Sequence, residues 1–138
     1  MNQGKYADAE PPFREALDGN RRKLGDAHPS TLNSINNLAF LLDTQGKYAD
    51  AERLYREALD GRRRELGDAH PDTLMTINNL ALLLEKQGKY DEAAINFELA
   101  ASGYDKVFGP NHEKTRRARV NAADAQRMRA CHQCCAIV

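Results

Sequence analysis

A 42-residue repeat is the feature that most constrains the fold of this chain. The tetrapeptide QGKY occurs at residues 3–6 and returns at 45–48 and 87–90. The segment LGDAHP at 24–29 returns at 66–71 with the same spacing, and a looser copy follows at 108–112. A period of this length indicates an array of similar units, each burying its apolar face against its neighbours. We therefore expect a stack of repeats.

Apolar residues between these markers follow a helical spacing. Leu32, Ile35, Leu38 and Leu42 are three or four positions apart, which places them on one face of a helix. Equivalent residues recur 42 positions later, and the second segment of each unit has the same period. We therefore predict an all-α fold of antiparallel helix pairs, with six helices at about 6–24, 29–44, 48–66, 71–86, 90–107 and 113–130.

The helices group into three repeat units. The units span about 3–44, 45–86 and 87–130, so residues 1–130 form one repeat domain and residues 131–138 are expected to form a flexible tail. Glycines recur inside the second helix of each unit. Since glycine costs about 1 kcal/mol relative to alanine in a helix interior, we expect a bend or a close helix contact at these positions. The glycines are Gly19, Gly61 and Gly103, and a Pro11–Pro12 pair interrupts the first copy.

The two end helices differ from the others. In the last helix, Arg116 and Arg119 occupy the positions of apolar Leu32 and Ile35, which is what a solvent-facing terminal helix requires. The first helix has no partner helix before it. Its apolar strip is expected to be uncovered and to promote self-association into a homo-oligomer. The strip consists of Tyr6, Ala9, Phe13 and Leu17.

Composition excludes several classes of protein. Twenty Lys and Arg balance twenty Asp and Glu among 138 residues, so the strong basic field of a dedicated nucleic-acid binder is missing. No apolar run approaches the roughly 18 residues of a membrane span, and the first residues lack the apolar stretch of a signal peptide. We therefore expect a soluble, cytoplasmic protein.

The pattern of small and large residues resembles the tetratricopeptide repeat. It includes Leu38, Ala39, Tyr48, Ala51 and Tyr55. The usual period is about 34 residues, and the longer 42-residue period, together with the motifs NNLA, QGKYADAE, REAL and LGDAHP, resembles the kinesin light chain type of repeat. The resemblance implies a right-handed α-solenoid whose concave groove is lined by the first helix of each pair.

The groove-facing positions can be read from the helix period. On the first helix of each pair they lie opposite the packed face, and Asn recurs among them at 37, 79 and 121. The resemblance implies that these amides pair with the main chain of an extended peptide; alternatively, one Asn of each pair bonds a neighbouring loop. The predicted groove residues are Asn33, Asn36, Asn37, Phe40, Asp43, Met75, Asn78, Asn79, Leu82, Glu85, Arg117 and Asn121.

Recurring histidines and basic runs have structural explanations. His28, His70 and His112 are about 10 Å apart in a helical array, too far to ligate one metal at about 2 Å, so a cap or loop hydrogen bond is expected. The basic runs at 21–23 and 62–64 complement helix C-termini. No phosphate loop, nucleophile elbow or HExxH motif is present. We predict no enzyme activity, no metal and no cofactor.

The tail does not repeat. Residues 135–138, CAIV, fit a C-terminal prenylation box, with Cys135 as the lipidated residue and Cys134 as a possible palmitoylation site. A disordered tail is the alternative. Membrane association is expected only if the tail is lipidated.

Two functions follow from these patterns. The leading hypothesis is a non-catalytic adaptor or scaffold that binds a protein or peptide partner in its groove. The alternative is a structural spacer or self-associating segment of a longer repeat array.

Overall fold

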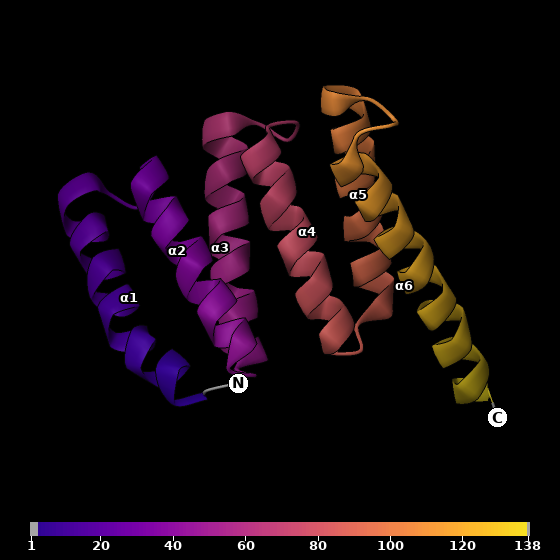
Figure 1. Cartoon of the computed structure of the whole chain (residues 1–138), viewed down its shortest axis with the longest axis horizontal. Coiled ribbons are helices and arrows are strands. Elements are labelled where there is room, and N and C mark those ends of the chain that lie inside the picture. The colour runs from indigo at the N-terminus through magenta and orange to yellow at the C-terminus, as the bar shows by residue number, and fades with distance from the viewer. Residues whose placement is uncertain (1–2, 138) are drawn as a thin grey trace. The chain divides into compact units, whose positions relative to one another are not determined.

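The computed structural model describes the backbone of residues 3–137 and the side chains of residues 5–131. Over this range it contains six helices and no strand, which confirms the all-α class (Figure 1). The first helix starts three residues earlier than predicted. The last helix continues through residues 131–137, which were expected to belong to the tail. The flexibility of this segment stays a prediction. The helices are α1 (Gln3–Leu24), α2 (Pro29–Thr44), α3 (Tyr48–Leu66), α4 (Pro71–Lys86), α5 (Tyr90–Phe108) and α6 (Glu113–Ile137).

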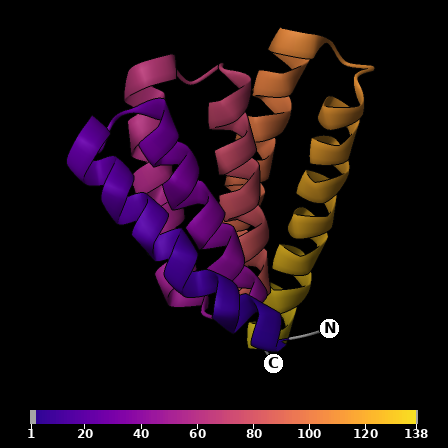
Figure 2. The same cartoon turned by 60° about the vertical axis from the view of Figure 1, so that its left-hand side comes forward.

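The helices form two compact units. Unit 1, residues 1–67, contains α1, α2 and α3; unit 2, residues 68–138, contains α4, α5 and α6. In unit 1, α2 packs against both α1 and α3, and in unit 2, α5 packs against both α4 and α6 (Figures 1 and 2). Each unit therefore has one central helix that contacts the two others.

The same repeat positions build both cores. Leu38 and Leu42 of α2, like Leu80 and Leu84 of α4, are almost fully buried. Their partners on the second helices alternate an aromatic ring with alanines, because small residues let the paired helices approach closely. Burial of each large apolar side chain contributes about 1.5–3 kcal/mol. The second-helix residues that show this alternation are Ala51, Tyr55 and Ala58 in α3 and Ala93, Phe97 and Ala100 in α5, all of them buried.

Two of the three helix-interior glycines mark close helix contacts. A Cβ atom on Gly61 would lie 2.5 Å from Cδ2 of Leu32, and one on Gly103 would lie 2.3 Å from Cδ2 of Leu74. A Cβ on Gly19 would meet nothing within 4 Å. The predicted close contact is therefore confirmed at Gly61 and Gly103, and α1 runs without a break through its proline pair.

The uncovered strip on α1 is narrower than predicted. Leu17 is buried, so it belongs to the core of unit 1. Phe13 is 38% exposed, whereas Tyr55 and Phe97, which hold the same repeat position in α3 and α5, are 0% exposed. Phe13 and the partly exposed Ala9 thus remain on the surface; self-association through them stays a prediction.

Histidines cap the first helix of each pair, as expected. Nδ1 of His28 accepts a hydrogen bond from the backbone N–H of Ser30 at 3.1 Å. His70 and His112 make the same bond to the N–H two residues later, at 3.0 and 3.1 Å. Each bond satisfies one of the donors that a helix N-terminus leaves unpaired.

Removal of one of these caps should lower stability. We expect His28→Ala to reduce the free energy of unfolding by about 1 kcal/mol, since the N–H of Ser30 loses its acceptor. His28→Asn should retain most of the stability, because asparagine is a preferred N-cap residue. Urea unfolding of both variants measures this difference. Equal losses for alanine and asparagine would show that the ring, rather than its acceptor nitrogen, stabilises this turn.

Candidate functional site

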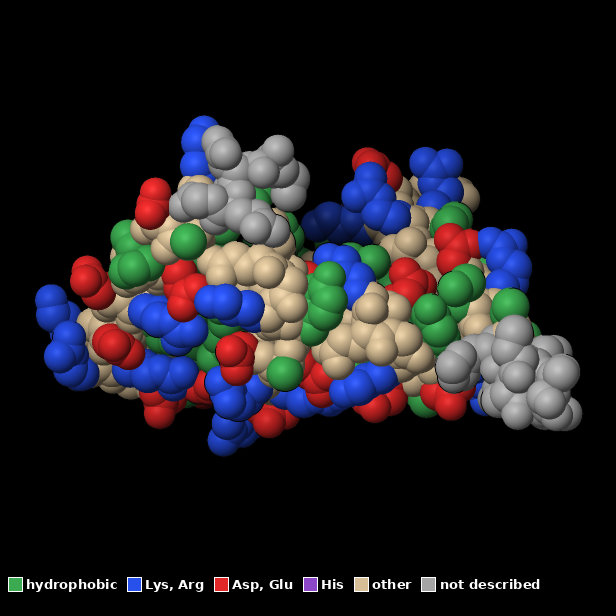
Figure 3. Space-filling model, turned by 90° about the horizontal axis from the view of Figure 1, so that it is seen from below, with side chains coloured by type: hydrophobic (Ala, Val, Ile, Leu, Met, Phe, Trp, Pro, Cys, Tyr) green, Lys and Arg blue, Asp and Glu red, His purple; other side chains and the backbone are tan. Residues whose placement is uncertain are grey.

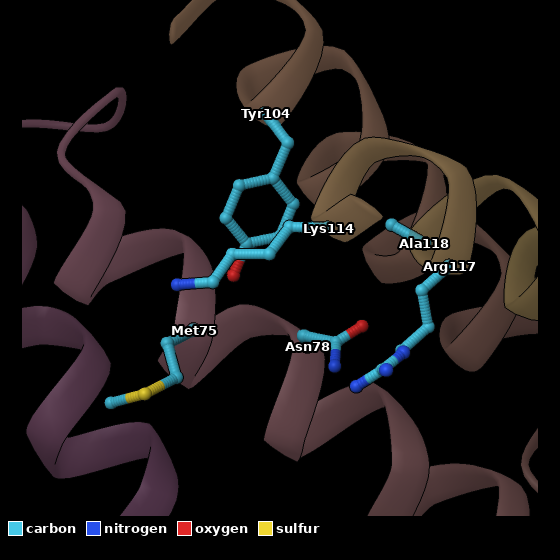
Figure 4. Close-up of a pocket in the computed structure, with 6 residues that line it drawn as sticks. All are labelled: Met75, Asn78, Tyr104, Lys114, Arg117 and Ala118. Atoms are coloured by element: carbon cyan, nitrogen blue, oxygen red, sulfur yellow. The ribbon is translucent and has the colours of Figure 1, made fainter. Parts of the chain in front are cut away.

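A pocket in unit 2 contains three of the predicted groove residues. Its volume is about 170 Å³, and it is an open pocket lined by side chains from α4, α5 and α6 (Figure 4). Met75, Asn78 and Arg117 were expected on the groove face. The complete lining consists of Met75, Asn78, Tyr104, Lys114, Arg117 and Ala118.

The local sequence explains how the lining residues come together. Met75 and Asn78 are three positions apart on α4, so they lie on the same helix face. Lys114 and Arg117 have the same spacing in the first turns of α6. Ala118 holds the repeat position of Ser34 and Thr76, and its short side chain leaves space at this point.

Tyr104, one of the lining residues, belongs to a run of aromatic rings beside the pocket. Tyr104, near the end of α5, is buried, and its ring centroid lies 6.0 Å from that of Phe108. The Phe108 ring stacks on His112 at 4.4 Å, and Nζ of Lys114 lies 5.7 Å from the Phe108 centroid. Burial raises the pKa of the Tyr104 phenol, so its hydroxyl remains protonated and can donate a hydrogen bond at neutral pH.

The charges around the pocket are unevenly distributed. Nη2 of Arg117 lies 2.7 Å from Oε1 of Glu113, and these side chains are 70% and 72% exposed. Farther along the same helices, burial and the nearby charge of Asp124 raise the pKa of Glu85. The beginning of α6 is therefore basic, whereas farther along this face Glu85 lies near Asp124, whose carboxylate is paired with Arg127. On the face seen from below, acidic and basic side chains are interspersed (Figure 3).

The other predicted groove residues are divided between surface and interior. Asn33 is exposed, and its Oδ1 accepts a hydrogen bond from Arg62 at 2.6 Å. Asn36 and Asp43 are buried, with exposures of 8% and 7%, which departs from the open face expected for them. Of the remainder, Asn37 and Phe40 are exposed, and Asn79, Leu82, Glu85 and Asn121 are half-buried.

Two of the predicted asparagines have an unsatisfied oxygen. Oδ1 of Asn36 and Oδ1 of Asn78 are buried and accept no hydrogen bond from the described residues. These positions are equivalent in the repeat. A buried acceptor without a donor costs about 1–3 kcal/mol.

The sequence interpretation missed Tyr104 because this residue belongs to a second helix. A signal was present, since the repeat position of Tyr104 holds a different polar residue in each copy. Nδ2 of Asn20 donates to Oγ of Ser34 at 2.7 Å, and Arg62 donates to Asn33. Asn20 and Arg62 therefore contact a residue of a first helix, and Tyr104, at the same repeat position, lines the pocket.

The described residues hold no group of three His, Cys, Asp or Glu side chains that could bind a metal. No helix among them is both long and apolar enough to cross a membrane.

The cysteines lie at the C-terminal end of the chain, and Cys131 is exposed. The proposed lipidation sites, Cys134 and Cys135, lie outside the residues whose side chains are described, so lipidation stays a prediction.

Comparison with protein families agrees with the repeat architecture. One model, described as tetratricopeptide repeat, matches residues 1–30 and 31–72, and a second with the same description matches 72–133. The chain belongs to the tetratricopeptide repeat family. Tetratricopeptide repeats are generally protein–protein interaction modules. A search of curated protein sequences found no match.

Solved structures show the same fold. The chain aligns with a crystal structure of "kinesin light chain nearly identical TPR-like repeats" from Podosopora anserina, with 21% identity and a TM-score of 0.86. The alignment covers 92% of this chain and 60% of that one. The structure of BtubC (BKLC) from P. vanneervenii aligns with 20% identity, a TM-score of 0.74 and coverage of 94% and 59%. This tetratricopeptide repeat chain therefore spans about 60% of the length of these structures.

Proposed function

We propose that the chain is a non-catalytic, cytoplasmic interaction module that binds an extended peptide from a protein partner. The peptide would lie along the face of α4 and α6 that contains the pocket. The observation that carries this proposal is the pocket itself, since it combines apolar Met75, the amide of Asn78 and the guanidinium of Arg117. Pockets that combine apolar surface with a few polar groups are typical binding sites.

The amides suit main-chain recognition. An Asn side chain offers one acceptor and two donors, so it can pair with a peptide N–H and C=O whatever the peptide side chains are. Asn78 lines the pocket, and Asn79 on α4 and Asn121 on α6 extend the set of amides.

The charge distribution favours one peptide orientation. Glu85 would attract a basic residue of the partner, whereas Lys114 and Arg117 would attract an acidic group. A peptide with one charge of each sign would therefore bind better in one direction than in the other.

Substitution of the asparagines tests the proposal. Peptides are first selected from a random library on the wild-type chain, and the affinity of one selected peptide is then measured. We expect Asn79→Ala combined with Asn121→Ala to weaken binding about tenfold or more, since two lost hydrogen bonds of about 0.5–1.5 kcal/mol each sum to about 1–3 kcal/mol, the peptide groups left unpaired add to this cost, and about 1.4 kcal/mol is one decade. The unfolding midpoint should change little, because these side chains lie outside the core.

A matched double variant serves as the control. Asn96→Ala with Asn111→Ala removes two amides from α5 and a connecting loop, and peptide affinity should be unchanged. If instead the Asn79 and Asn121 substitutions lower stability while binding persists, the amides support the fold itself. The structural-spacer function would then replace peptide binding.

A further inference from the structure

The basic side of the pocket has more donors than a single carboxylate needs. Arg117 and Lys114 extend from α6, the guanidinium toward the Asn78 amide and the ammonium past Tyr104 toward Met75 (Figure 4). Both side chains are exposed, so they can turn toward a shared ligand. The Tyr104 hydroxyl is a third donor group, and Nδ2 of Asn78 is a fourth. None of the described residues that line the pocket is an Asp or Glu.

Both cations are available to a ligand. The structure shows no carboxylate partner for the ammonium of Lys114 among the described residues, and Nζ lies over the Phe108 ring at 5.7 Å from its centroid. The Arg117–Glu113 ion pair is largely exposed, so solvent screens it and it contributes little stability. The N-terminus of α6 adds positive potential, because the helix dipole favours an anion at this end.

The size of the pocket indicates a side-chain group. Pockets that enclose drug-sized ligands measure roughly 300–1,000 Å³. The volume of about 170 Å³ is smaller, and would hold one side-chain group of a larger partner. A carboxylate has two oxygens and one charge, whereas a phosphate monoester has three terminal oxygens and a charge of about −1.5 to −2. Two cations and two further donors match the phosphate better.

We propose that Lys114 and Arg117 bind the phosphate group of a phosphoserine or phosphothreonine in the partner peptide. This inference rests on the proposed peptide-binding function and adds regulation to it, since phosphorylation of the partner would control binding. The peptide main chain would run past Asn78, and the phosphate would occupy the end of the pocket away from Glu85 and Asp124.

Three degenerate peptide libraries test this assignment. They carry phosphoserine, glutamate or serine at one fixed central position and random residues elsewhere. On the wild-type chain, one enriched phosphopeptide should bind at least about tenfold more tightly than its serine version, and the glutamate version should remain within about threefold of serine. The double variant Lys114→Gln with Arg117→Gln should reduce the preference for phosphate to less than about twofold, with the affinity for the serine peptide retained.

A charge-matched variant controls for general electrostatics. Lys106→Gln with Arg116→Gln removes two exposed cations of unit 2 that do not line the pocket, and the preference for phosphate should survive. An unchanged preference in the Lys114 and Arg117 variant would overturn the assignment, as would equal binding of the glutamate and phosphoserine peptides. Peptides that bind regardless of phosphate would refute this inference alone, whereas libraries without any binder would refute the proposed function as well.

Discussion

Phe97→Ala is expected to lower the free energy of unfolding by about 3–5 kcal/mol, the usual cost of emptying a buried aromatic site. The Phe97 side chain is fully buried in α5, where small neighbouring residues fit closely around it. Phe13 holds the same repeat position in α1 but is 38% exposed. Phe13→Ala should therefore cost only about 1–2 kcal/mol, in proportion to its partial burial.

Urea unfolding followed by circular dichroism measures both substitutions on the whole chain. Phe13→Ala is the matched control, because it makes the same chemical change at the equivalent position of another repeat. Similar losses for the two variants would mean that α1 packs against another surface in solution, such as a second copy of the chain. A small loss for Phe97→Ala would contradict the core described for unit 2.

Gly103→Ala should destabilise the chain by about 1–3 kcal/mol, although alanine is the better helix former. The new Cβ would lie 2.3 Å from Cδ2 and 2.9 Å from Cδ1 of Leu74, which is 1% exposed and would have to shift within the core. Gly19→Ala should have the opposite sign. Its Cβ would meet no atom within 4 Å, so the helix propensity of alanine should stabilise the chain by about 0.5–1 kcal/mol.

A double-mutant cycle identifies the cause of the loss. If the clash with Leu74 is responsible, Gly103→Ala combined with Leu74→Ala should cost less than the sum of the two single substitutions. Strict additivity would show that the Leu74 side chain is not what excludes a Cβ at position 103. Destabilisation by Gly19→Ala would show that α1 has a neighbour at this point in solution.

The sequence predicted the helices well because the information is local. Apolar spacing, the Leu-Gly ends and the His-Pro starts each specify a helix boundary without reference to the rest of the fold. The end of α6 was less predictable, since residues 131–137 have neither a glycine nor a proline to stop a helix. The sequence predicted a bend or a close helix contact at Gly61 and Gly103. Only the packed structure identifies Leu32 and Leu74 as the close neighbours.

The candidate site was only partly predictable because it depends on packing between helices. Met75, Asn78 and Arg117 follow from the outward face of first helices. Tyr104 comes from a second helix, and its position in the pocket depends on how α5 packs beside α6. Burial of Asn36 and Asp43 also depends on their neighbours, because both residues lie on the face that the helical period of α2 leaves open.

Mapping of the bound peptide by amide chemical shifts tests the central claim most directly. The measurement uses isotope-labelled wild-type chain and the peptide selected on it. We predict that the largest shift changes occur at Met75, Asn78, Asn79 and Arg117, on the face of α4 and α6 that contains the pocket. Changes confined to the exposed side of α1 around Phe13, or to α5 around Ile95, would contradict peptide binding at this face.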